Sequence, residues 1–330
     1  MCVSHHAVAD GLFFIVGTGR CGTTLLQAML SSHSRLAIPA ETRFFGQADP
    51  VSAGLHDPLL DTELETYISA RRSDWWWKEL GLVDEEFAAA VRGGQRSAKA
   101  IYLWMLHRLT ANLGKPRVGE KTPYYGQWAE HLLALFPKAR FIHLHRDSRD
   151  VIASLRSQKW WVAKSAMSCV MVCRDVLDHQ AGLRDTWSKD RLLTVRYETL
   201  VKHPADELER VCRFLDEQFE SAMLRFHGRT EVGFLELERD WKGLTLQPLS
   251  ESRIGRYRRE LPDREIRLVE WLLGRRLTEL GYERDSHAED DPDWPSSFVA
   301  ERERWEAERA RSGPERLIDV DPLMRSSDKS

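Results

Sequence analysis

The chain has 330 residues, of which 42% are apolar and 30% are charged, and its formal net charge is −3. This is the composition of a folded globular protein, and the near balance of charge gives no reason to expect nucleic acid or an anionic membrane as a partner. Five cysteines in so long a chain argue against a disulfide framework. The first residues lack the features of a signal peptide and no apolar run is long enough to cross a membrane, so we expect a cytoplasmic protein without a membrane span.

The first predicted elements are a strand, a glycine turn and a helix within residues 13–30. Residues 13–16 are all apolar and β-favouring, which is typical of a strand buried on both faces. The turn matches the nucleotide-binding P-loop at its glycines, but Thr23 replaces the lysine and a cation, Arg20, comes earlier. An ordinary turn would use the same glycines. We favour a phosphate-binding loop, one that balances fewer charges than the triphosphate–metal clamp of a kinase.

A second strand is predicted at residues 36–39, and it ends in the charged cluster Glu41-Thr42-Arg43. Side chains just beyond a parallel strand face the ligand crevice. Residues 46–117 then read as short helices and polar turns, with the run Trp75-Trp76-Trp77. This segment predicts an insertion that covers the sheet. Its tryptophans either form an aromatic platform in an acceptor-binding lid or fill a small core between the inserted helices.

Two further strands are predicted at residues 139–145 and 192–195, followed by Arg146 and Arg196 respectively. Helical patterns alternate with the strands and follow them, at residues 23–30, 128–136, 150–156, 160–187, 204–215, 264–280 and 301–311. Repeated strand–helix units predict an α/β fold with a central parallel sheet flanked by helices, similar in layout to P-loop proteins.

We expect one domain over residues 1–284, in which residues 46–117 are the helical insertion. Residues 285–330 are charged and contain proline, so we expect a C-terminal extension that is partly disordered.

The charged groups at the strand ends predict two anion sites in one crevice. Arg20 and the backbone N–H groups of residues 22–24 form one, and Arg146 with the hydroxyl of Ser154 forms the other. Two separate monophosphate sites suit a bisphosphorylated nucleotide better than ATP. The acidic metal ligand that a kinase needs at a strand end is missing, because the third and fourth strands end in Arg146 and Arg196.

These segments resemble sulfotransferases that use 3′-phosphoadenosine 5′-phosphosulfate (PAPS). Residues 19–25, GRCGTTL, are similar to the family's 5′-phosphosulfate loop, and Arg146 and Ser154, eight residues apart, are similar to its 3′-phosphate motif. The other similar segments are Glu41-Thr42-Arg43 and residues 197–201 (tyrosylprotein enzymes), residues 120–123 (heparan-type enzymes), and residues 253–261 and 280–282 (bacterial members).

The resemblance implies a P-loop-like sulfotransferase fold, PAPS as co-substrate and a set of nucleotide-binding residues. Those at the 5′-phosphate are Arg20, Gly22, Thr23 and Thr24, with Cys21 and Leu25 in the same loop; those at the 3′-phosphate are Arg146 and Ser154; and Tyr197 contacts the nucleotide.

The resemblance also implies Glu41 as the general base and Lys121 as the cation that stabilises charge on the sulfuryl group and on the leaving phosphate oxygen. In-line transfer to a hydroxyl needs such a base and such a cation. The alternatives are a structural ion pair between Glu41 and Arg43 and a surface position for Lys121.

The chain departs from the family pattern at two positions. Cys21 stands where serine is usual, and Gln247 stands where the protein-tyrosine enzymes carry a cation, which Lys242 or Arg253 could replace. Many cytosolic sulfotransferases use a catalytic histidine. We interpret the nearby histidines, at positions 143 and 145, as partly buried strand residues instead.

We therefore predict transfer of a sulfuryl group from PAPS to an acceptor hydroxyl, or less favourably an amine, with no metal. The acceptor would be a small molecule, a sugar or a phenol. The alternatives are a P-loop-related small-molecule kinase and a non-catalytic nucleotide-binding protein. The sequence leaves the acceptor and the oligomeric state open.

Overall fold

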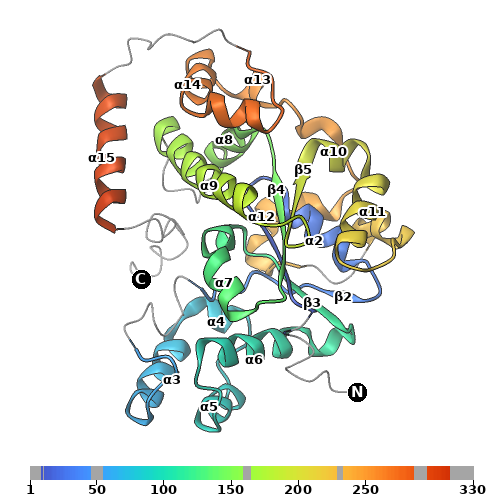
Figure 1. Ribbon diagram of the computed structural model, residues 1–330, viewed down its shortest axis with the longest axis vertical. Helices are drawn as coiled ribbons and strands as arrows, with labels where there is room; N and C mark the ends of the chain where they lie inside the picture. The colour runs from blue at the N-terminus through green and yellow to red at the C-terminus, as the bar shows by residue number, and fades with distance from the viewer. Residues whose placement is uncertain are drawn as a thin grey trace.

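The computed structural model describes residues 9, 11–45, 55–158, 165–228, 233–285 and 296–312. Within these ranges, parallel strands form one five-stranded sheet in the order β2-β3-β1-β4-β5 (Figure 1). The strands are β1 (Phe13–Gly17), β2 (Leu36–Ala37), β3 (Arg117–Glu120), β4 (Arg140–His145) and β5 (Leu192–Arg196). The predicted α/β class and parallel sheet are confirmed.

Strand β3 is the one that the hydrophobic pattern did not predict. Its sequence, RVGE, holds a single large apolar residue, so it carries neither an apolar run nor a clear alternation. Gly119 is required there because the ring of Phe13 covers it; a Cβ at this position would lie 2.2 Å from a ring carbon of Phe13. Since β3 lies between β1 and β2, the residue that follows it, Lys121, emerges between the phosphate loop and the Glu41 segment.

Helices cover both faces of the sheet. Alternate residues of a strand point to opposite faces, and accordingly Phe13 and Ile15 belong to one buried core whereas Phe14 and Val16 belong to another. The first core is completed by α2 (Thr23–Ser31), α8 (Ser148–Arg156), α9 (Ala166–Thr186), α11 (Pro204–Phe214) and α14 (Asp263–Glu279). The second is completed by α3 (Leu64–Ser73), α4 (Trp75–Glu79), α5 (Glu85–Arg92), α6 (Ala98–Thr110) and α7 (Ala129–Leu135). Helices α3 to α6 lie together at the lower end of the molecule in Figure 1, and α7 lies above them.

Most predicted helices are present with bounds shifted by a few residues. The helix expected from residue 160 is described from Ala166, and residues 159–164 lie outside the described ranges. Pro123 begins a 3-10 turn, η3 (Pro123–Trp128), before α7. The remaining helical elements are η1 (Asp61–Glu63), η2 (Ala111–Leu113), α10 (Tyr197–Lys202), η4 (Ser221–Gly228), η5 (Glu236–Glu238), α12 (Arg239–Lys242), η6 (Gly243–Leu246), η7 (Glu251–Arg253), α13 (Tyr257–Glu260) and α15 (Ser296–Ser312).

The tryptophan run belongs to the core of the insertion. Trp76 and Trp77 are buried, and Trp77 packs edge-on against Phe87 with their ring centroids 5.1 Å apart. The small-core interpretation therefore describes these two rings better than an exposed platform does.

Helix α15 packs along α9 (Figure 1). The indole N–H of Trp305 donates to Asp175 of α9 over 3.1 Å. Within the described ranges, no helix combines the length and the apolar character that crossing a bilayer requires.

Candidate active site

The loop between β1 and α2 needs glycine for steric reasons. Gly22 has φ +108°, a left-handed conformation that side chains rarely adopt, and a Cβ there would lie 2.5 Å from the ring of Tyr197. At Gly17 a Cβ would lie 2.4 Å from the backbone oxygen of Leu144. The loop can therefore pack tightly between β4 and Tyr197, directly before the first turn of α2, and a helix N-terminus is a favourable place for an anion.

This loop borders a cavity of ≈ 590 Å³ at the carboxyl ends of the strands. The predicted site residues that line it are Arg20, Gly22, Thr23, Thr24, Leu25, Glu41, Arg146, Ser154 and Tyr197. Two others lie behind the wall. Cys21 is fully buried, and burial raises the pKa of its thiol to about 11. Lys121 is fully buried as well and reaches the cavity through its contact with Glu41.

The two predicted phosphate arginines are linked through shared contacts. Arg20 donates from Nε to the hydroxyl of Ser154 over 3.2 Å, and Arg146 donates to the backbone oxygen of Arg20 over 3.4 Å. The guanidinium of Arg146 also lies 4.5 Å from the ring centre of Tyr197. Burial, together with the charges of Arg146 and Arg256, lowers the pKa of Arg20 to about 10. Such mutual repulsion is relieved when an anion binds between the guanidinium groups.

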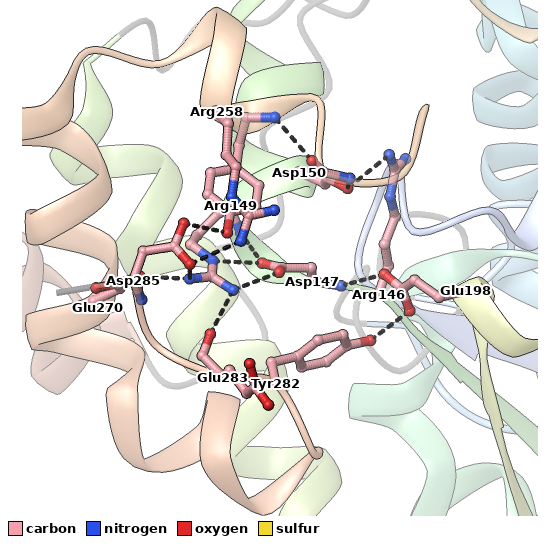
Figure 2. Close-up of polar contacts among 12 residues, drawn as sticks. Arg146, Asp147, Arg149, Asp150, Glu198, Arg258, Glu270, Tyr282, Glu283 and Asp285 are labelled. Atoms are coloured by element: carbon pink, nitrogen blue, oxygen red, sulfur yellow. Dashed lines mark hydrogen bonds and ion pairs between the residues drawn. The ribbon is translucent and has the colours of Figure 1, made fainter. Parts of the chain in front are cut away.

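A buried polar network behind Arg146 joins the C-terminal segment to α8 (Figure 2). Asp150 accepts backbone N–H groups from Gly255 at 2.8 Å and Tyr257 at 3.0 Å, and it lies 3.4 Å from Arg146. Arg149 bridges Asp147 at 2.7 Å and Glu270 at 2.5 Å.

This attachment places further polar residues at the cavity wall, where Gln247, Arg253 and Arg256 lie. Position 247 is therefore near the cavity although it carries no charge, and two arginines from the same segment supply cations there.

Glu41 and Lys121, which are 80 positions apart in the chain, form a direct contact in the structure. The ammonium of Lys121 donates to Glu41 Oε1 over 2.5 Å and approaches the hydroxyl of Thr24 at 3.4 Å. Lys242 donates to the same carboxylate oxygen over 2.7 Å, and Arg43 pairs with the other oxygen at 3.5 Å. The ion pair with Arg43, which was the alternative interpretation of Glu41, is present as one of three cationic contacts.

These contacts set the charge states of the pair. Burial alone would raise the pKa of Glu41, but Lys121, Lys242 and Arg43 hold it well below its usual range. Burial lowers the pKa of Lys121 to about 8, and the neighbouring carboxylate opposes that effect. Near neutral pH, Glu41 is therefore a carboxylate, and Lys121 is mostly an ammonium beside the phosphate loop.

Glu120 is a positioning residue that the sequence singled out only as part of a similar segment. Its carboxylate accepts the backbone N–H and hydroxyl of Thr42, both at 3.1 Å, and the hydroxyl of Thr122 at 2.7 Å. Glu120 thereby links Thr42, the residue after Glu41, to Thr122, the residue after Lys121. Burial raises the pKa of Glu120 to about 7.

Trp76 supports the same segment from the insertion. Its indole N–H donates to the backbone oxygen of Glu41 over 3.0 Å, and the guanidinium of Arg43 lies 3.7 Å from its ring centre. The tryptophan run is thus linked to the site through the backbone of Glu41, and it is absent from the cavity wall.

The strand histidines, His143 and His145, are buried and absent from the cavity wall. Burial lowers the pKa of His145 to about 3 and that of His143 well below its usual range, so both are neutral. This agrees with their interpretation as strand residues. Among the residues that the structure describes, no group of His, Cys, Asp and Glu side chains has the arrangement of a metal site.

Comparison with known proteins decides the family. Residues 13–221, which hold the loop, Glu41, Lys121 and the Arg146 segment, match the sulfotransferase family. The chain belongs to the sulfotransferase family. The family, the fold and the class of enzyme predicted from the sequence are therefore confirmed.

The proteins that this chain resembles differ in the functions that their names give. It is 28% identical over 220 residues to a protein-tyrosine sulfotransferase of Drosophila melanogaster, a match that covers 64% of this chain and 39% of the fly protein. It is 27% identical over 310 residues to the nodulation protein NoeE of Sinorhizobium fredii, covering 84% of this chain and 67% of that protein. The sulfotransferase domain from the curacin biosynthetic pathway has the same fold, with a TM-score of 0.57, 20% identity, and coverage of 83% of this chain and 98% of that one.

Proposed function

We propose that the protein transfers a sulfuryl group from PAPS to a hydroxyl of a small-molecule acceptor. The observation that carries this proposal is the contact of Glu41 with Lys121 at 2.5 Å, with Lys121 itself 3.4 Å from Thr24 of the phosphate loop. A base and a cation thus lie together where the loop meets the cavity. This is the pair of groups that transfer to a hydroxyl requires.

The residues at the cavity suit the donor, PAPS, that the family implies. Gly22 allows the loop backbone to approach a phosphate closely, and Arg20 and Arg146 are crowded cations that an anion would stabilise. In this proposal the loop residues hold the 5′-phosphate, Arg146 and Ser154 hold the 3′-phosphate, and Tyr197 borders the nucleotide. Because the side chain of Arg20 lies against Ser154, Arg20 is placed to contact either phosphate.

The reaction needs no redox partner. The acceptor oxygen forms a bond to sulfur while the bond from sulfur to the 5′-phosphate oxygen breaks, and that oxygen leaves with the electron pair. Glu41 takes the proton of the acceptor hydroxyl, and Lys121 stabilises the charge that develops on the sulfuryl and leaving oxygens. The three cations around Glu41 lower its pKa and so weaken it as a base in the free protein. In this proposal the bound donor, which is an anion, attracts some of these cations away from Glu41 and so raises its pKa.

The lining of the cavity favours an acceptor with a flat, partly apolar group. Besides Tyr197, six aromatic residues line the cavity: Phe45, Tyr124, Tyr125, Trp128, Phe226 and Trp241. Aromatic walls bind a phenol or the apolar face of a sugar ring. We therefore propose a ring-bearing small molecule with a free hydroxyl as acceptor.

A screen of phenols, sugars and hydroxylated natural products with sulfur-labelled PAPS tests the function. We expect label to move to at least one hydroxyl acceptor and adenosine 3′,5′-bisphosphate to be released in equal amount. Phosphate transfer from ATP with no label transfer from PAPS would identify a kinase instead. Tight binding of the bisphosphate without any transfer across the panel would favour a binding protein.

A further inference from the structure

Residues 233–256, here called the closing segment, bring a second lysine to Glu41. Lys242, on α12, donates to Glu41 Oε1 over 2.7 Å, and Lys121 donates to the same oxygen over 2.5 Å. Lys242 is buried and is separated from Glu41 by 201 positions in the chain. No local motif links the two residues, so the contact exists only in the folded protein.

Glu238 holds Lys242 in place. It lies four residues earlier, is fully buried, and its carboxylate is 2.5 Å from the Lys242 ammonium. Its other oxygen accepts the backbone N–H of Leu235 over 3.1 Å. A buried carboxylate is costly without such partners, so its position specifies where the ammonium of Lys242 lies.

Three cations surround Glu41. Its carboxylate lies within ion-pair distance of Lys121, Lys242 and Arg43, and the last two also lie within ion-pair distance of Glu238. Fixed positive charges therefore meet at a buried site that borders the phosphate loop. Fixed cations in a dry site stabilise negative charge that develops during a reaction.

The closing segment also contacts the phosphate loop directly. Arg20 donates to the backbone oxygen of Trp241 over 3.0 Å, one residue before Lys242. Lys121 approaches Glu41 from the side of Thr24, and Lys242 approaches it from the closing segment. Two ammonium groups from different parts of the chain thus meet at the base.

We propose that Lys242 is a second catalytic cation that binds the sulfuryl oxygens during transfer, and that Glu238 is the positioning residue that holds it beside Glu41. This rests on the proposed function. In the step, the acceptor oxygen bonds to sulfur, the bond from sulfur to the 5′-phosphate oxygen breaks, and the proton goes to Glu41. Lys242 exchanges its contact with Glu41 for the sulfuryl oxygens, which frees the carboxylate to accept that proton.

The test compares Lys242→Met, Lys242→Arg and Glu238→Gln with Arg239→Met. Arg239 is the matched control because it lies on the same helix, is exposed and pairs with Glu236 at the surface. The double variant Glu238→Gln with Lys242→Met removes one buried charge of each sign, so it keeps the charge balance if Lys242→Met alone fails to fold. Two quantities are measured: kcat with saturating labelled PAPS, and calorimetric affinities for PAPS and for adenosine 3′,5′-bisphosphate without acceptor.

We expect Lys242→Met to lower kcat about a hundredfold, the order of effect of removing one oxyanion-stabilising donor. The same variant should weaken PAPS binding about fivefold and bisphosphate binding less than twofold, because only PAPS carries the sulfuryl group. Lys242→Arg should restore part of kcat, Glu238→Gln should lower kcat about tenfold, and Arg239→Met should change none of these values.

A folded Lys242→Met variant whose kcat and PAPS affinity stay within twofold of the parent would overturn the proposal. Equal weakening of PAPS and bisphosphate would overturn it too, since Lys242 would then bind the nucleotide. The PAPS and bisphosphate affinities need no acceptor, so they test Lys242 even if no acceptor is found. Absence of transfer by the parent protein would instead count against the proposed function.

Discussion

The two sides of the cavity are built in different ways. On the donor side, the loop after β1 and the residues after β4 are short continuous segments that follow strand ends, and a buried network supports Arg146 from behind (Figure 2). On the acceptor side, Glu41 depends on Lys121, on Trp76 of the insertion and on Lys242 of the closing segment. Local sequence therefore specifies the proposed nucleotide site, whereas the environment of Glu41, the proposed base, arises from contacts between distant segments.

The largest expected effect separates chemistry from donor binding. Glu41→Gln keeps the shape of the side chain but removes the base, and we expect kcat to fall about 10²–10⁴-fold. Affinity for adenosine 3′,5′-bisphosphate should stay within threefold, because the nucleotide is held on the donor side. Labelled transfer and calorimetry measure the two quantities. Glu65→Gln, on the exposed face of α3, is the control. Unchanged turnover in Glu41→Gln would remove Glu41 from the chemistry.

A substitution on the donor side should affect nucleotide binding more than turnover. Arg146→Ala removes a cation that contacts Tyr197 and Asp150, and loss of a charged hydrogen bond of about 1.5–3 kcal/mol predicts a roughly 10- to 100-fold weaker bisphosphate affinity. Transfer at saturating PAPS should fall much less. Arg275→Ala, at an exposed position on α14, should leave the affinity unchanged. If Arg146→Ala binds the bisphosphate as tightly as the parent, the 3′-phosphate site lies elsewhere.

The pH dependence of transfer tests the acceptor side, because Glu41 and Lys121, the two proposed catalytic groups, both lie there. Glu41 is ionised well below neutral pH, whereas the pKa of Lys121 is lowered to about 8. Its ammonium is thus present below pH 8 and is lost as the pH rises, so kcat/KM should fall about tenfold per unit above that value. The fall should be absent from the residual activity of Lys121→Met. A parent profile that stays level to pH 10 would show that the charge of Lys121 is not needed.

The smallest expected effect concerns the insertion. Trp76→Phe removes the hydrogen bond to the backbone of Glu41 and weakens the contact with Arg43. One net hydrogen bond of about 1 kcal/mol predicts a roughly fivefold lower kcat and an unchanged bisphosphate affinity. Trp75→Phe, in the same helix, is the control. Loss of bisphosphate affinity in Trp76→Phe would show that the two sides are not independent.

The sequence predicted that the loop residues and Arg146 would lie at one cavity, because each of these segments follows an apolar strand. The strand of residues 13–17 is apolar and its loop contains the glycines of a phosphate-binding turn. Arg146 directly follows β4, and Ser154 lies in α8, the helix that comes next. By contrast, the sequence did not predict β3. Gly119 lies under the ring of Phe13 and Glu120 accepts a hydrogen bond from Thr42, and both contacts join segments that are distant in the chain, so no local pattern reveals them.

The pairing of Lys242 with Glu41 and Glu238 depends on how the closing segment folds back over the sheet. The sequence could name Lys242 as a substitute cation for position 247, but it could not place that cation beside the base. The tryptophan run was ambiguous for a similar reason, because an aromatic residue packs equally well in a core or at a ligand.

The structure of the protein in complex with adenosine 3′,5′-bisphosphate tests the central claim most directly. We expect the 5′-phosphate on the backbone N–H groups of the loop after β1 and the 3′-phosphate on Arg146 and Ser154. Glu41 and Lys121 should lie beside the 5′ end, where the sulfuryl group would be. A nucleotide bound with its 5′ end away from Glu41, or outside this cavity, would contradict the account.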